Sequence, residues 1–177
     1  AKGLEAPGVA DLGTGSGNLA IAAARHHPSA RVTATDVSPD ALELASRNAQ
    51  RHGVADRIQF VRSDLLAELP EDAVFHFILS NPPYVASEDI ERLPTGVRDF
   101  EPRIALDGGP GGTAVVERLI RQASRHLAPS GYLILEIGAP QEQAVRELIA
   151  AREFEPTQTA RDYSGHPRVV WARKRAR

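Results

Sequence analysis

The sequence contains no cysteine and no methionine, and lysine occurs only at Lys2 and Lys174. Without cysteine, the chain has no disulfide framework, no thiolate metal ligand and no cysteine nucleophile. No apolar run approaches the roughly 20 residues that a membrane-spanning helix needs, and the start of the chain shows no signal peptide. We therefore expect a cytoplasmic protein that is not embedded in a membrane.

The absence of methionine also bears on the limits of the chain. A translated protein starts with methionine, whereas this sequence starts with Ala1-Lys2-Gly3, which predicts a processed chain or an excised fragment. The length of 177 residues suits one domain of ordinary size better than two. We expect residues 1–177 to form a single domain.

An excess of positive charge is absent as well. Lys and Arg total 21 against 23 Asp and Glu, for a formal net charge of −2, so direct nucleic-acid binding is not expected. The six histidines are scattered without the spacing of metal ligands, and we expect no metal. A hydrophobic content of 42% with 25% charged residues is typical of a globular protein and excludes a wholly disordered chain.

Apolar segments of strand character alternate with segments of helical period along the chain. Strands are predicted at 9–12, 31–35, 57–62, 74–79, 132–137, 154–160 and 168–173, and helices at 18–26, 38–53, 113–127 and 141–151. This alternation predicts an open, mostly parallel sheet with helices on both faces, whose last two strands pair like a hairpin. Residues 82–112 are rich in proline and glycine, which is typical of a functional or disordered loop.

A glycine-rich turn follows the first predicted strand. Its residues are Gly13, Thr14, Gly15, Ser16 and Gly17. Glycines let the backbone turn tightly and approach a ligand, and the helix that follows presents free N–H groups. Such a turn suits a phosphate or a carboxylate. The dinucleotide-binding fingerprint requires glycine at the sixth position, where this chain has Asn18, and this departure disfavours NAD.

Two aspartates come after the next two strands. Asp36 lies about 20 residues beyond the glycine turn, where a carboxylate can accept both hydroxyls of a ribose; alternatively it is an exposed acid near the helix that starts at Ser38. Asp64 could accept a hydrogen bond from an exocyclic adenine amine beside the apolar Leu65, or it could be an ordinary turn residue. All these positions follow strands, so we expect them at one edge of the sheet, where such sheets bind ligands.

The glycine turn, followed by an acid after each of the next two strands, resembles the class I S-adenosylmethionine-dependent methyltransferases. The resemblance implies a Rossmann-like fold with a seven-stranded, mostly parallel sheet and a C-terminal antiparallel strand. It also implies that Gly13–Gly17 cradle the methionine end of S-adenosyl-L-methionine, that Asp36 binds its ribose, and that Asp64 and Leu65 bind its adenine. The product would be S-adenosyl-L-homocysteine.

A second motif, Asn81-Pro82-Pro83-Tyr84, follows the predicted central strand. The two prolines stiffen the chain, so Asn81 and the Pro82 carbonyl become fixed hydrogen-bond acceptors. Tyr84 offers a flat face on which a planar group can stack. The arrangement suits a substrate NH₂ group conjugated to a π system, because two acceptors raise the electron density on a poorly nucleophilic nitrogen. We expect the sulfur end of the cofactor to face Asn81.

Four further blocks resemble the release-factor glutamine methyltransferases, the PrmC/HemK family. They are Ser46–Ala49, Phe100–Gly109, Leu135–Gly138 followed by Gln141, and Asp162–Val170. The resemblance implies methyl transfer to the side-chain amide nitrogen (N5) of the glutamine in the Gly-Gly-Gln motif of peptide chain release factors. Asn81, Pro82 and Pro83 would then bind the glutamine amide, and Tyr84 would pack on it. We expect the enzyme to be a monomer.

The chain departs from this family in three places. Leu65 stands where family members often have an aromatic residue, and Pro110-Gly111-Gly112-Thr113 replaces the usual Asp-Gly-Leu. The N-terminal helical substrate-recognition domain of the family is also absent from the sequence. Two alternatives stay open: an N6-adenine methyltransferase acting on DNA or RNA, with a basic surface near Tyr84, and a non-catalytic nucleoside- or NAD-binding module.

Overall fold

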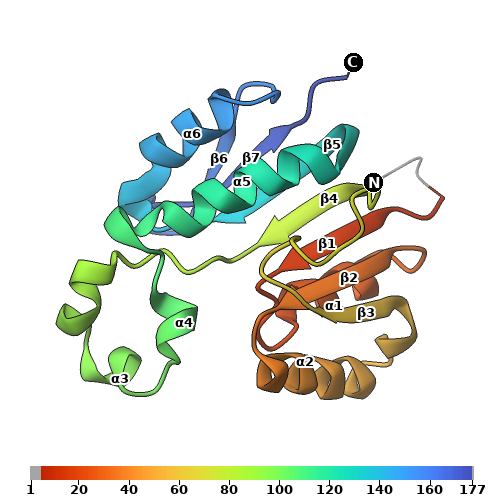
Figure 1. Cartoon of the computed structure of the whole chain (residues 1–177), viewed down its shortest axis with the longest axis horizontal. Coiled ribbons are helices and arrows are strands. Elements are labelled where there is room, and N and C mark those ends of the chain that lie inside the picture. Colours follow the sequence, from red (N-terminus) through yellow and green to blue (C-terminus); the bar gives the residue numbers. More distant parts are fainter. Residues whose placement is uncertain (1–4, 177) are drawn as a thin grey trace.

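The computed structural model describes residues 5–176, and its centre is one seven-stranded sheet (Figure 1). The strands are β1 (Gly8–Leu12), β2 (Arg31–Asp36), β3 (Ile58–Arg62), β4 (Phe75–Ser80), β5 (Leu127–Glu136), β6 (Gln158–Arg161) and β7 (Pro167–Arg173). Their order is β3-β2-β1-β4-β5-β7-β6. The pairs among β1 to β5 are parallel, whereas β7 runs antiparallel to both β5 and β6. The predicted fold class is confirmed, including the antiparallel C-terminal strand.

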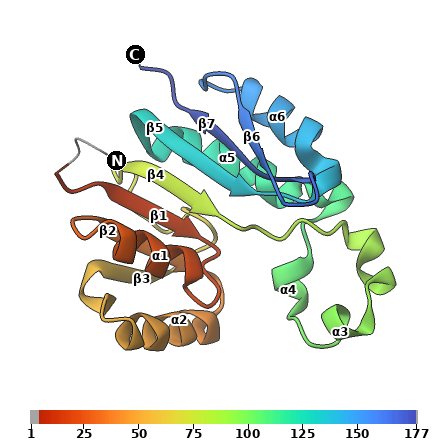
Figure 2. The same ribbon diagram turned by 180° about the vertical axis from the view of Figure 1, so that it is seen from behind.

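Helices cover both faces of the sheet. The longer ones are α1 (Asn18–His26), α2 (Pro39–Arg51), α5 (Ala114–His126) and α6 (Glu142–Ala150). Within β1, Val9 packs with α1 residues in one apolar cluster, whereas Ala10 and Leu12 pack with α5 and α6 residues in the other. Side chains alternate across a strand, so this division shows two core layers. Figure 1 accordingly shows α5 in front of the sheet, and Figure 2 shows α1 in front of the opposite face.

Local sequence signals explain the start of α2. The Ser38 hydroxyl oxygen accepts a hydrogen bond from the Ala41 N–H at 3.2 Å, and Pro39 occupies the first helical position. The apolar residues Ala45 and Ala49 are the buried residues of this helix. The helix starts where the sequence predicts it to start.

The stretch predicted as an irregular loop, residues 82–112, contains four short helices. They are η2 (Ser87–Arg92), α3 (Thr95–Arg98), α4 (Arg103–Leu106) and η3 (Pro110–Gly112). In Figure 1 the stretch extends away from the sheet and then returns to it. At the return the Val85 N–H donates to the Leu106 carbonyl at 2.9 Å, and the Gly108 N–H donates to the Val85 carbonyl at 2.8 Å. Helices this short have no apolar periodicity, which is why the sequence did not reveal them.

Several predicted strand limits are corrected. β4 begins at Phe75, the first residue paired with β5, and Val74 is 55% exposed. β5 begins at Leu127, five residues before the predicted start. The strand expected at 154–160 is shorter, because Pro156 cannot donate a ladder hydrogen bond and Phe154 forms only an isolated bridge to Lys174.

The remaining elements are two 3-10 helices, η1 (Ala55–Arg57) and η4 (Ala139–Gln141). Ala1-Lys2-Gly3, which carried the expectation about the start of the chain, lies outside the described residues. Among residues 5–176, no helix has the length and apolar character required to cross a bilayer.

Candidate functional site

The loops that carry the predicted site open at one edge of the sheet. β1 ends at Leu12, which is in register with Thr35 of β2 and with Ser80 of β4, and Asp36 is in register with Arg62 of β3. The strands are parallel, so the segments after Leu12, Asp36, Arg62 and Ser80 leave the sheet on the same side. The shared edge predicted from the sequence is confirmed.

The glycine turn approaches α2 closely at one point. Gly17 has a φ of +87°, and a Cβ there would lie 3.0 Å from the Ala45 Cβ, so a larger residue would push the turn away from α2. At Gly13 and Gly15, in contrast, an added Cβ would meet nothing within 4 Å. The backbone of the turn therefore borders open space at the sheet edge, where a ligand can approach it.

Asp36 is bonded directly to the glycine turn. Its Oδ2 accepts from the Gly15 N–H at 2.9 Å, and its Oδ1 accepts from the Ser38 N–H at 3.0 Å. Each carboxylate oxygen has a second lone pair. Asp36 is half-buried rather than exposed, and its remaining lone pairs can still accept from ribose hydroxyls, so its contact with the ribose stays a prediction.

Asp11 is a buried acid to which the sequence analysis gave no role. It is 1% exposed, and its Oδ2 accepts from the Thr14 hydroxyl at 2.6 Å and from the Ala20 N–H at 3.0 Å. Its Oδ1 is buried without a hydrogen-bond partner among residues 5–176. Burial raises the pKa of Asp11 to about 6, although the bonds from Thr14 and Ala20 oppose the rise. An acid in an otherwise apolar strand was the signal that could have revealed it.

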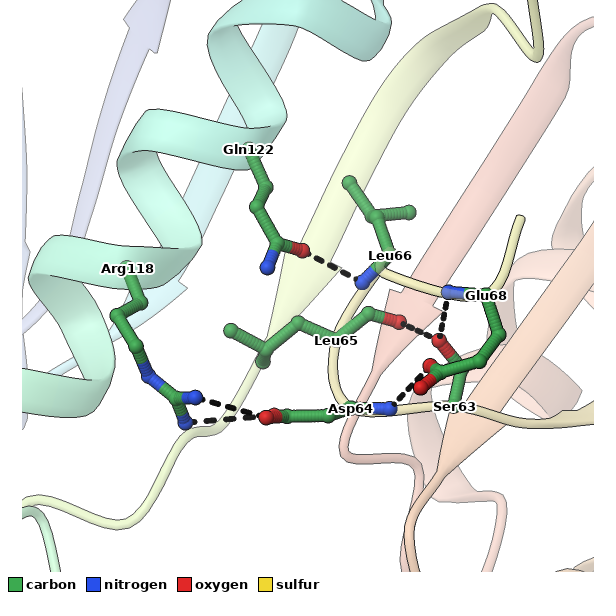
Figure 3. Close-up of polar contacts among 7 residues, drawn as sticks. All are labelled: Ser63, Asp64, Leu65, Leu66, Glu68, Arg118 and Gln122. Carbon is green, nitrogen blue, oxygen red and sulfur yellow. Dashed lines mark hydrogen bonds and ion pairs between the residues drawn. The ribbon is translucent and has the colours of Figure 1, made fainter. Parts of the chain in front are cut away.

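Asp64 is paired with a residue that the sequence analysis did not connect with it. The Arg118 guanidinium of α5 donates two hydrogen bonds to the Asp64 carboxylate, one to each oxygen, with N–O distances of 2.7 and 3.3 Å (Figure 3). The two side chains are 44% and 45% exposed, respectively. This bidentate ion pair fixes the carboxylate in one orientation and still leaves lone pairs for another donor.

α5 also fixes the turn that follows Asp64. The Leu66 N–H donates to the Gln122 Oε1 at 2.7 Å, one helical turn beyond Arg118, as Figure 3 shows. Leu65 adopts a φ of +60° and is only 8% exposed, within the core cluster that includes α5. Its side chain points toward α5 (Figure 3), so the contact between Leu65 and adenine stays a prediction.

The Asn81-Pro82-Pro83-Tyr84 loop begins where β4 ends. The Ser80 hydroxyl donates to the Leu12 carbonyl at 2.6 Å, which ties the end of β4 to the end of β1 just before the glycine turn. Asn81 is exposed, Pro82 is buried and Tyr84 is half-buried. A Cβ on Gly138 would lie 3.2 Å from the Tyr84 ring, so the ring lies over the backbone at the end of β5.

No group of three or more His, Asp or Glu side chains in the described part of the chain is arranged to bind a metal ion.

The sequence pattern of one protein family, described as methyltransferase small domain, matches residues 2–94, more than half of the chain. The chain belongs to this family. The matched region contains the glycine turn, Asp36, Asp64 and the Asn81–Tyr84 loop. The comparison leaves the role of each of these residues as a prediction.

Relatives of this methyltransferase domain carry more specific names. The release factor glutamine methyltransferase of Rhodopirellula baltica is 38% identical over 170 residues, covering 95% of this chain and 57% of that protein. The enzyme of the same name from Gloeobacter violaceus is 42% identical, covering 93% of this chain and 59% of that protein. The ribosomal protein uL3 glutamine methyltransferase of Bradyrhizobium diazoefficiens is 48% identical over 134 residues, covering 76% of this chain and 41% of that protein.

The chain spans less than two thirds of the length of these relatives.

Among solved structures, the ribosomal protein L11 methylase of Lactobacillus delbrueckii superposes with a TM-score of 0.70 at 26% identity, covering 98% of this chain and 73% of that one. A Thermus thermophilus 16S rRNA methyltransferase superposes with a TM-score of 0.68 at 23% identity, covering 96% of this chain and 38% of that one. The second likeness supports the fold alone.

Proposed function

We propose that this chain is the catalytic domain of an S-adenosylmethionine-dependent protein glutamine methyltransferase that modifies peptide chain release factors. The observation that carries the proposal is the 38–42% identity, over more than nine tenths of the chain, to enzymes named for this activity. The site supports it independently, because the Asn81–Tyr84 loop leaves the same sheet edge as the glycine turn.

The residues at this edge fit the chemical groups of S-adenosylmethionine. The buried Oδ1 of Asp11 has no partner among the described residues, and such an oxygen suits a ligand that brings a hydrogen-bond donor. The open space beside Gly13 and Gly15 suits a ligand that approaches the backbone. Asp36 would bind the ribose hydroxyls and Asp64 the adenine amine. When bound, the cofactor would supply a methyl group on a positively charged sulfur.

The Asn81–Tyr84 loop would bind the substrate amide. The side-chain oxygen of Asn81 and the carbonyl oxygen of Pro82 would accept hydrogen bonds from the two amide hydrogens of glutamine. These bonds raise the electron density on the nitrogen and fix its direction, and the Tyr84 ring packs against the planar amide. Rate enhancement would then come from positioning and electrostatics.

Mass spectrometry of release factor after incubation with the protein and S-adenosylmethionine tests the proposal. We expect the peptide that contains Gly-Gly-Gln to gain one methyl group, and the Asn81→Ala variant to lose most of this gain. A release factor with alanine in place of the motif glutamine is the matched control and should gain none. An unmodified peptide, under conditions in which the Gloeobacter violaceus relative modifies it, would contradict the proposal.

Ribosomal protein uL3 is a second candidate substrate. The relative named for uL3 is more identical to this chain, at 48%, but over only 134 residues. Offering uL3, release factor, RNA and DNA side by side with a tritiated methyl donor separates the candidates. We expect release factor to be labelled fastest, and faster labelling of nucleic acid would support the N6-adenine alternative instead.

A further inference from the structure

Three backbone segments meet beside Tyr84, and the Gln141 side chain bonds to all of them. Its Nε2 donates to the Tyr84 carbonyl at 2.8 Å and to the Gly112 carbonyl at 2.9 Å. Its Oε1 accepts from the Gly138 N–H at 3.3 Å. Gln141 therefore connects the end of the Asn81–Tyr84 loop with the start of α5 and the end of β5.

The orientation of the Gln141 amide follows from its partners. Both groups that face Nε2 are carbonyl acceptors, and the group that faces Oε1 is an N–H donor. A flipped amide would direct an oxygen at two carbonyl oxygens, so only one orientation satisfies the contacts. Both hydrogens of the NH₂ group are used, and the side chain is half-buried at this point.

The segments around Gln141 are packed backbone against backbone. A Cβ at Gly112 would lie 2.6 Å from the Gln141 Nε2 and would also clash with the Tyr84 carbonyl oxygen. A Cβ at Gly108 would lie 2.9 Å from both the Pro83 carbonyl oxygen and the Tyr84 Cα. Because no space remains for a side chain there, a shift of one segment displaces the others.

We propose that Gln141 is a positioning residue for the substrate amide, acting through the Tyr84 carbonyl; this inference rests on the proposed function. The φ angles of Pro82 and Pro83 are fixed by their rings. Few backbone angles therefore remain free between the Pro82 and Tyr84 carbonyls, so holding the Tyr84 carbonyl restricts the direction of the Pro82 carbonyl and the position of Asn81. In this role Gln141 would act through backbone groups, because its side chain bonds to Tyr84, Gly112 and Gly138.

Gln141→Met tests this role, because methionine keeps the length of the side chain and removes the hydrogen bonds. In the purified protein we expect kcat for release-factor methylation to fall about 10- to 100-fold. The KM for S-adenosylmethionine should stay within about twofold, because the Gln141 side chain bonds to Tyr84, Gly112 and Gly138 rather than to Asp36 or Asp64. Gln143→Met is the matched control and should keep both constants, since the exposed Gln143 side chain bonds, within the described residues, to Glu147 on its own helix.

Hydrogen exchange gives a second readout that needs no substrate. In Gln141→Met, amides of residues 84–89 should exchange faster, because the Tyr84 carbonyl has lost its donor, whereas amides of β1 and β2 should be unchanged. If the wild-type protein does not methylate release factor, the proposed function fails and this comparison alone tests Gln141. Unchanged exchange at 84–89, or a Gln141→Met variant whose kcat equals that of Gln143→Met, would overturn the inference.

Discussion

At the scale of the residue, Asp11 connects the stability of the glycine turn with pH. Its pKa is raised from 3.8 to about 6 mainly because burial disfavours the charged form. The folded state therefore binds the proton more tightly than the unfolded state. The contribution of Asp11 to the free energy of unfolding is full below pH 4 and is lost as the pH rises through 6.

We predict that Asp11→Asn removes this pH dependence. The change from 3.8 to about 6 corresponds to roughly 3 kcal/mol, so the stability of the wild type relative to Asp11→Asn should fall by up to that amount between pH 4 and pH 7. Urea unfolding at both pH values measures it, with the exposed Asp40→Asn as the control. A difference that stays constant with pH would show that Asp11 does not titrate in this range.

Asp64 is the second residue whose chemistry can be tested alone. In Asp64→Asn only one acceptor oxygen remains, and it cannot serve both Arg118 and an adenine amine as well as a carboxylate does. We expect about tenfold weaker binding of S-adenosylhomocysteine by isothermal titration. The exposed Asp72→Asn should bind normally, and equal affinities for the two variants would remove Asp64 from the cofactor site.

At the scale of the element, the regular helices and strands could be predicted and the connections between them could not. The helix predicted at 18–26 matches α1, because its apolar period and the preceding glycines are local signals. The contact between Arg118 and Asp64 joins residues 54 positions apart, and the bond from Gln141 to Tyr84 spans 57. No local pattern specifies such pairs, because they arise only when α5 and η4 pack at the sheet edge.

The return of the 82–112 stretch to the sheet gives a prediction at this scale. In Gly108→Ala the new Cβ would lie 2.6 Å from the Gly112 carbonyl oxygen, and backbone must move to relieve the clash. We expect a loss of about 2 kcal/mol or more in unfolding free energy, measured by thermal denaturation. Gly96→Ala, in α3 and with nothing within 4 Å of its Cβ, is the matched control. It should be neutral or slightly stabilising, and equal effects at the two positions would contradict the packing described for Gly108.

At the scale of the whole molecule, the sheet brings distant parts of the sequence to one side. The glycine turn, Asp36, Asp64 and the Asn81–Tyr84 loop all follow parallel strands, and β7 then pairs antiparallel with β5, with β6 beyond it. This convergence could be predicted from strand order, because parallel strands end on the same side. The chain covers 57–59% of the release-factor enzymes that it resembles, so the identity of its protein substrate is tested by locating the methyl group.

Fragmentation mass spectrometry that locates the methyl group in the modified release factor is the most direct test. We expect a methyl group on the side-chain amide nitrogen of the Gly-Gly-Gln glutamine, present with the wild-type protein and largely absent with Asn81→Ala. A methyl group on another residue or another atom, or equal modification by the Asn81→Ala variant, would contradict it.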